Sequence, residues 1–351
     1  MTEFIKKLIS YLRLYITVKK KIPYISCNDN FTLFNYYSLR IKSLILLFLR
    51  RINENEFKQI KTKLNQKKSR LKKRLGIAYN VFDGYELLES SIKTVRDEAS
   101  FIVVVYQLIS NYGEKADKEL EETLFRLKQN KLIDELYCYT PNLKDPQACE
   151  REKRDIGLIL AKRAKCKYYM DMDCDEFYIK DQLRNALDYI QYNKIACSAV
   201  SIIEYLKKPT YQLANGYIFS PHKDYIFYCP FIMKIFKFKY NLHSNKNFSC
   251  LVDPTRGLNA GEKFYLFSKH DVAMHHMSTI RKNLEKKFNN SNLNKGANRS
   301  TIKSIQDEII KFNYEKNIEK RSIFNGIVVN ETDNIFDIPE MTIKDSTIKN
   351  K

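Results

Sequence analysis

The segment Lys167–Tyr178 reads KYYMDMDCDEFY and combines two patterns that together indicate the fold. Its first part, Lys167–Met170, is a short aromatic and apolar run, which is typical of a buried strand. Its second part places four carboxylates within six positions: Asp171, Asp173, Asp175 and Glu176. An acidic cluster directly after a buried strand is typical of a ligand site at the carboxyl end of a parallel sheet.

Strands and helices alternate on the amino-terminal side of this segment. The β-branched run FIVVVY at Phe101–Tyr106 is typical of a strand buried on both faces. The apolar spacing predicts strands at 76–81, 101–106, 133–139 and 167–170, and helices at 85–99, 118–131 and 151–165. This alternation predicts an α/β fold with a mixed, mainly parallel sheet flanked by helices.

The pattern changes after Tyr178, where connections become longer. We expect a helix at 182–192, strands at 196–203, 217–220 and 231–238, and a helix at 302–314. The segment Asn283–Ser300 is rich in Asn and Lys and is expected to be mobile. Residues 301–351 are predicted as a C-terminal helical segment and tail.

The acidic cluster predicts a metal site. If the strand continues through it, Asp171, Asp173 and Asp175 share one face, because side chains alternate along a strand. Crowded carboxylates repel one another unless a cation neutralises them. A hard divalent ion, Mn2+ or Mg2+, held by carboxylates and substrate phosphates meets this need. The alternative is a solvated acidic turn.

A second candidate group lies near residue 275. His275 and His276 are adjacent and account for two of the five histidines. On a strand they point to opposite faces, so we expect one of them to be a ligand, the alternative for either being a buried structural histidine. Arg281 and Lys282 follow and could neutralise a phosphate, or could belong to a solvated helix face.

These residues resemble a known family. Met172–Phe177, MDCDEF, is similar to the DxD signature of GT-A glycosyltransferases, in the DxDEF variant of family-2-like enzymes of bacterial surface-glycan synthesis. Arg151–Leu158 resembles the helix before that signature, with Asp155 where the family has Asn. Ala78–Gly84 occupies the place of the family's first strand and nucleotide-binding loop. The resemblance covers roughly 75–281.

The resemblance implies a GT-A (Rossmann-like) catalytic domain at 75–300. Charge and apolar spacing predict a basic helical N-terminal extension at 1–74 before it. It implies a metal-dependent transferase that moves a sugar from a UDP- or GDP-sugar to a glycan or lipid-linked acceptor, as in lipopolysaccharide or O-antigen assembly. The metal ligands it implies are Asp173, Asp175, Glu176, His275 and His276. The donor-binding residues it implies are Tyr79, Asn80, Asp83, Gln107, Arg154, Asp173, Arg281 and Lys282. Because family-2 enzymes generally invert the anomeric configuration, a carboxylate base is expected downstream, with Asp253 and Glu204 as candidates.

The basic charge is concentrated at the start of the chain. Of the formal net charge of +20, residues 1–75 carry +15, from 19 Lys or Arg against 4 Asp or Glu. Apolar and basic residues alternate at helical spacing in Phe4–Arg13, which indicates an amphipathic helix for an anionic membrane surface. Composition bias is the alternative. With no signal peptide and no CxxC pair among the eight cysteines, we expect a cytoplasmic protein, peripheral on the inner membrane through residues 1–50.

Two other functions compete. A haloacid-dehalogenase-type phosphatase also places DxD after a strand, but its nucleophile follows the first strand of the core, and here about ninety residues of strand and helix come first. A nucleic-acid-binding protein would use the basic arm, but no zinc-finger, helix-turn-helix or RNP-like motif accompanies it. We therefore expect no nucleic-acid partner.

Deleting residues 1–70 should release the protein from membranes, because the deletion removes the basic amphipathic helix, while hydrolysis of the sugar donor survives. Flotation with anionic vesicles and a donor-hydrolysis assay measure the two effects. A truncated protein that still floats with the vesicles would contradict this role of the arm.

Overall fold

The computed structural model describes residues 54–56, 58–62, 74–214, 228–235, 256, 263–290, 299–314, 322–323 and 327–339. Within the predicted extension, residues 54–56 and 58–62 are helical. Most of the basic arm, the strand predicted at 217–220 and the candidate base Asp253 lie outside the described residues. Among those described, no helix has the length and apolar character needed to span a bilayer.

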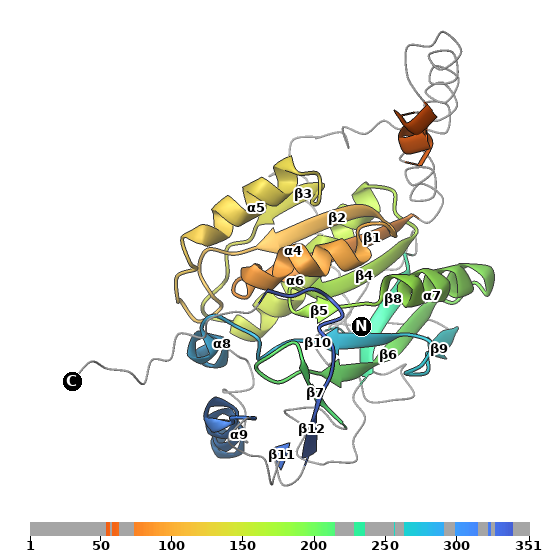
Figure 1. Cartoon of the computed structure of the whole chain (residues 1–351). Helices are drawn as coiled ribbons and strands as arrows, with labels where there is room; N and C mark the ends of the chain where they lie inside the picture. The colour runs from red at the N-terminus through yellow and green to blue at the C-terminus, as the bar shows by residue number, and fades with distance from the viewer. Residues whose placement is uncertain are drawn as a thin grey trace.

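Among the described residues, the main sheet has nine strands and is mixed (Figure 1). Eight of them follow the order β3-β2-β1-β4-β8-β6-β10-β5, and β9 pairs with β6. β8 is antiparallel to β4 and β6, and β5 is antiparallel to β10, whereas the remaining pairs are parallel. The strands are β1 Leu75–Val81, β2 Ala99–Tyr106, β3 Glu135–Cys138, β4 Tyr168–Asp173, β5 Glu176–Phe177, β6 Cys197–Glu204, β8 Tyr228–Lys234, β9 Phe264–Leu266 and β10 Ala273–His276. The predicted mixed, mainly parallel sheet is confirmed.

Helices cover both faces of this sheet, as predicted (Figure 1). Alternate residues of β1 lie in two hydrophobic cores, one on each face of the sheet. Ile77 and Tyr79 pack with α4, α5 and α7, and Ala78 packs with α6. The helices are α4 Tyr85–Val95, α5 Glu119–Gln129, α6 Pro146–Arg163 and α7 Lys180–Tyr192. Because β1 and β2 are buried on both faces, they read as continuous apolar runs in the sequence.

The amino terminus of α6 lies five residues before the predicted start. Pro146 occupies the first turn, where its missing N–H costs nothing. Oδ1 of Asp145 accepts a hydrogen bond of 3.1 Å from the backbone N–H of Ala148, which caps the helix. The extra turn matters for the site, because it includes Glu150, which pairs with Arg154 one turn later.

The described residues of the C-terminal part contain more regular structure than predicted. The segment expected to be mobile contains the helix α8, Leu284–Asn289, whose Leu284 and Phe288 are buried. The predicted C-terminal helix is α9, Arg299–Lys311, and two unpredicted strands follow it. These are β11 Ser322–Ile323 and β12 Ile327–Glu331, which form a three-stranded sheet with β7 Tyr211–Leu213. α8 and α9 pack with this small sheet in one apolar cluster.

The last described residues pack against the edge of the main sheet that β5 and β10 form. Ile338 is buried in a cluster with Phe177 of β5 and Met277. The ring of Phe336 lies 5.2 Å from that of Phe177 and 5.0 Å from that of His275, between centroids. The C-terminal segment therefore packs directly against β5 and β10, the two strands that carry Glu176 and His276.

Gly157 allows α6 to lie close to β1, and its replacement by Ala should destabilise the fold. A Cβ at Gly157 would lie 2.4 Å from Cβ of Ala78 and 2.8 Å from Oη of Tyr169. We expect Gly157→Ala to lower the free energy of unfolding by about 2 kcal/mol, a typical cost of overpacking, measured by urea denaturation. The exposed Arg151→Ala on the same helix should change it by less than about 0.5 kcal/mol. Equal stability of both variants and the wild type would contradict the close packing.

Candidate active site

The acidic cluster divides into two parts because β4 ends within it. β4 stops at Asp173, and the chain turns through Cys174 and Asp175 before β5 begins. Asp171 and Asp173 share a face, since both contact Arg154. Asp175 was expected to share it only if the strand continued, and the turn after Asp173 interrupts the two-residue alternation of the strand. Asp175 faces a separate set of partners.

Arg154, from α6, holds the first part of the cluster. Its Nη1 lies 2.8 Å from Oδ2 of Asp171, and its Nη2 lies 3.4 Å from Asp173. Asn80, at the end of β1, donates a hydrogen bond of 2.9 Å to Oδ1 of Asp171. Burial raises the pKa of Asp171, against the opposing effect of Arg154. Both oxygens of Asp171 are bound by protein groups, so this residue positions Arg154 and Asn80.

Arg256 bridges the two strands of the cluster. Its Nη2 lies 2.5 Å from Oδ2 of Asp173, and its Nη1 donates a hydrogen bond of 2.8 Å to Oε2 of Glu176. Burial raises the pKa of Glu176 to about 7, although Arg256 acts in the opposite direction. For Asp173, Arg154 and Arg256 together outweigh burial and hold the pKa well below its usual range. Asp173 has 32% of its side chain exposed and forms the solvent side of the cluster.

Asp175 is buried among basic groups. It pairs with the guanidinium of Arg281, lies 3.5 Å from Nζ of Lys287 and 3.8 Å from Nε2 of His276. Burial alone would raise the pKa of Asp175, but these three cations lower it well below the ordinary value. The carboxylate is therefore ionised at any physiological pH.

The turn after β1 closes against Arg281. Gly84 has φ 70°, in the left-handed region that favours glycine. A Cβ at this position would lie 1.0 Å from Nη1 of Arg281, so a side chain is excluded for a second reason. The same Nη1 lies 4.0 Å from Oδ1 of Asp83. The predicted nucleotide-binding loop and the acidic cluster are therefore joined through Arg281.

The two histidines of β10 point to opposite faces, as expected for a strand. Nδ1 of His276 lies 2.7 Å from Oε1 of Glu204 at the end of β6. Burial lowers the pKa of His276, but Glu204 and Asp175 more than compensate and raise it to about 9. His275 instead bonds to the hydroxyl of Tyr205 at 2.9 Å, and burial lowers its pKa to about 4. Of the pair, of which only one was expected to be a ligand, His276 faces the carboxylates and His275 packs in the core.

Glu204 cannot serve as the predicted base in this arrangement. It is 1% exposed, and its Oε1 is bound to His276. An acceptor hydroxyl has no access to a carboxylate enclosed in this way. The contact instead fixes the imidazole, with the Nδ1 proton held by Glu204 and Nε2 directed at Asp175, which is the usual role of a carboxylate behind a metal-binding histidine.

Asp175, Glu176 and His276 could together hold a metal ion. One ligand atom from each lies within 4.8 Å of the others. Oδ1 of Asp175 is buried and has no hydrogen-bond partner among the described residues, which leaves a lone pair for a cation. Two carboxylates and one imidazole are suitable donors for a divalent ion such as Mn2+. The residues present therefore fit the predicted metal.

The ends of β1 and β2 carry further polar groups beside this cluster. Oδ1 of Asn80 and Oε1 of Gln107 are buried without a hydrogen-bond partner in the described part of the chain. Gln107 is held next to β1, since its N–H donates to the carbonyl of Val81. Tyr79 was wrongly predicted to contact the nucleotide: it is fully buried, and its hydroxyl lies 3.0 Å from Oγ of Ser91 in the core.

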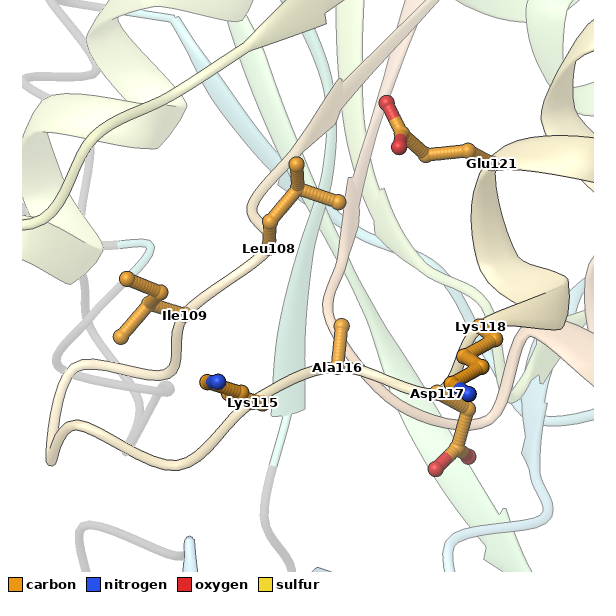
Figure 2. A pocket seen from close by; sticks show the side chains of 7 residues that line it. All are labelled: Leu108, Ile109, Lys115, Ala116, Asp117, Lys118 and Glu121. Atoms are coloured by element: carbon orange, nitrogen blue, oxygen red, sulfur yellow. The ribbon is translucent and has the colours of Figure 1, made fainter.

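The loop after β2 forms a pocket of about 310 Å³ (Figure 2). Glu121 lies at one end of it and Ile109 and Lys115 lie at the other. The lining is partly apolar and partly charged: Leu108, Ile109, Ala116, Lys115, Asp117, Lys118 and Glu121. Leu108 directly follows Gln107, so the pocket opens beside the carboxyl end of β2, where ligands bind in sheets of this class.

Helix α8 connects this pocket with the acidic cluster. Nζ of Lys286 lies 2.8 Å from Oδ1 of Asp117 at the pocket, and the next residue, Lys287, reaches Asp175. The predicted phosphate ligand Lys282 has other partners than the acidic cluster. Its backbone N–H donates to Glu86, and its Nζ lies 6.0 Å from the ring centroid of Tyr85. Lys287 therefore takes the position that the sequence analysis gave to Lys282.

Two basic site residues were missed from the sequence. Lys287 could have been found, because Leu284 and Phe288 have the four-residue spacing of a buried helix face and Asn283 caps that helix. Arg256 had no such signal, since its segment has no periodic pattern and its partners lie 80 and 83 residues away.

No protein-family model matches the sequence, and no curated protein matches it. Solved structures show partial similarity. TarS from S. aureus has a TM-score of 0.35 and 10% identity over 70% of this chain and 45% of TarS. GalNAc-T7 with UDP, GalNAc and Mn2+ has a TM-score of 0.35 and 11% identity over 59% of this chain and 45% of that protein. Mannose-1-phosphate geranyltransferase from Thermus thermophilus has a TM-score of 0.25 and 10% identity over 43% of this chain and 47% of that protein. This chain thus spans less than half the length of each of these three structures.

Replacing Glu204 by Gln should lower the pKa of His276 from about 9 toward or below its ordinary value of 6.5, because the main group that raises it is removed. NMR titration of the metal-free protein measures this change. Since the folded pKa exceeds the unfolded one, the ion pair stabilises the wild type below pH 6.5 and this contribution is lost as the pH rises through about 9. The exposed Glu119→Gln on α5 is the control. An unchanged pKa of His276 in Glu204→Gln would contradict the pairing.

Proposed function

We propose that this chain is a metal-dependent glycosyltransferase of the GT-A type, which moves a sugar from a UDP- or GDP-sugar to a glycan or lipid-linked acceptor. The observation that carries the proposal is the convergence of Asp175, Glu176 and His276 at the β4–β5 turn. Arg281 links the turn after β1 to that group, and Lys286 and Lys287 of α8 link the pocket after β2 to it. A metal site next to a pocket at the carboxyl ends of parallel strands suits a nucleoside diphosphate.

Asp175, Glu176 and His276 would hold the metal, Mn2+ or Mg2+. When bound, such an ion supplies positive charge that stabilises the leaving diphosphate. Glu204 holds the proton on Nδ1 of His276 and so keeps Nε2 available as a ligand. Oδ1 of Asp175 is the donor atom that the protein leaves without a partner among its described residues.

The basic groups around Asp175 would stabilise the leaving group from the protein side. Arg281 and Lys287 lie on one side of the cluster, and Arg281 also contacts the turn at Asp83. A phosphate oxygen placed beside them would receive charge-assisted hydrogen bonds. The pocket after β2 would hold the nucleoside. Asn80 and Gln107, at the ends of β1 and β2, remain proposed donor contacts through side-chain oxygens that have no partner among the described residues.

The residues proposed for the acceptor substrate are inferred from the sequence alone. We propose Asp253 as the base that deprotonates the acceptor hydroxyl, in an inverting reaction, because Glu204 is enclosed by His276. The basic arm at residues 1–50 would hold the enzyme peripherally on the inner, cytoplasmic membrane face, near a lipid-linked acceptor of lipopolysaccharide or another surface polysaccharide.

A thermal-shift screen with UDP-, GDP- and CMP-sugars, with and without Mn2+, tests the proposal. One nucleotide class should raise the Tm by several degrees in a Mn2+-dependent way, since ligand at 100 times its Kd adds about 2.7 kcal/mol of stability. Asp175→Asn should abolish this shift, because it removes the proposed ligand charge.

The control variant is Asp181→Asn, whose side chain is 82% exposed on α7 and which should keep the full shift. Stabilisation that persists without Mn2+ and in Asp175→Asn would rule out this metal site. No shift with any sugar nucleotide would rule out the donor class.

A further inference from the structure

Arg256 occupies the carboxylates that a metal would use. Its Nη1 lies 2.8 Å from Oε2 of Glu176, and its Nη2 lies 2.5 Å from Oε1 of the same residue. Nη2 also lies 2.5 Å from Oδ2 of Asp173. Arg256 is 2% exposed, so this fork is enclosed by protein. Both oxygens of Glu176 are therefore already bound to a cation of the chain itself.

The other carboxylates of the cluster are also paired with basic groups of the chain. The carboxylates of Asp171, Asp173, Asp175, Glu176 and Glu204 contact the basic groups of Arg154, Arg256, Arg281, Lys287 and His276. Crowded carboxylates attract a divalent cation because of their uncompensated charge. Here little such charge is left, and a cation that approaches Glu176 meets a guanidinium on the same oxygens.

Arg256 differs from Arg154 and Arg281 in the partners of its ion pairs. Arg154 also pairs with Glu150 and Asp171, away from the metal group, and Arg281 is packed over Gly84. Arg256 has its ion pairs with Asp173, whose side chain is partly exposed, and with Glu176 of the metal group, and its Nη1 also lies 3.3 Å from Sγ of Cys229. A guanidinium that fits a carboxylate bidentately fits a phosphate in the same way.

We propose that Arg256 is an internal counter-ion that excludes a divalent cation from Glu176 until a nucleoside diphosphate is present, when its guanidinium moves from the carboxylates to the diphosphate. This inference rests on the proposed function. It makes metal and nucleotide bind cooperatively, since each supplies the charge that the other leaves uncompensated.

The test is Mn2+ binding to the full chain without nucleotide, measured by isothermal titration calorimetry. Arg256→Met should bind Mn2+ roughly tenfold more tightly than the wild type, a typical size of coupling between sites, because Glu176 is released. The control is Arg126→Met, which removes the same charge from a side chain that is 52% exposed and should leave Mn2+ affinity unchanged. Equal Mn2+ affinity of Arg256→Met and wild type would overturn the inference.

A second measurement uses the wild type and does not depend on the variant folding. In crystals soaked with Mn2+ and UDP or GDP, the Arg256 guanidinium should have left Glu176 and should contact the diphosphate. Mn2+ ligated by Glu176 with Arg256 still on both of its oxygens would overturn the inference and leave the proposed function standing. Failure of the wild type to bind Mn2+ or either nucleotide under any condition would overturn the proposed function itself.

Discussion

The arrangement of this protein around its site depends on the pairing of buried carboxylates with basic side chains. Removing a carboxylate from water costs several kcal/mol unless a cation and hydrogen bonds replace the water. Asp175 is 1% exposed and Glu176 is equally buried, so neither could be tolerated alone. Asp175 is paired with Arg281 after β10 and with Lys287 on α8. Glu176 is paired with Arg256, which also comes from a separate part of the chain. The same ion pairs that satisfy the site therefore also hold these elements in place.

Much of the main sheet could be predicted from the sequence, because its central strands are buried on both faces. The runs that became β1 and β2 consist almost wholly of apolar residues, and such runs are readable without tertiary information. β5, β7 and β10 were not predicted as strands, because they have two to four residues each and their pairing is decided by distant partners. The helix α8 was missed because its Asn- and Lys-rich composition outweighed the spacing of Leu284 and Phe288.

The site could be predicted only where its residues are adjacent in the sequence. Asp173, Asp175 and Glu176 were found because they form a motif. Tyr79 was wrongly assigned because position along a strand does not reveal which face is buried. Which carboxylate pairs with which base is a property of the folded chain, so the importance of Arg256 appears only in the structure. For the same reason Glu204 changed from a candidate base to a partner of His276.

The C-terminal segment supports the two strands that carry Glu176 and His276. β5 and β10 carry Glu176 and His276 on one face, and on the other their neighbours Phe177 and His275 contact Phe336. Ile338 completes the same apolar cluster. A nascent chain that has exposed the whole of the main sheet still lacks this support. We therefore expect β5 and β10 to reach their final order only after residues 336–338 have left the ribosome, although the acidic motif emerges about 160 residues earlier.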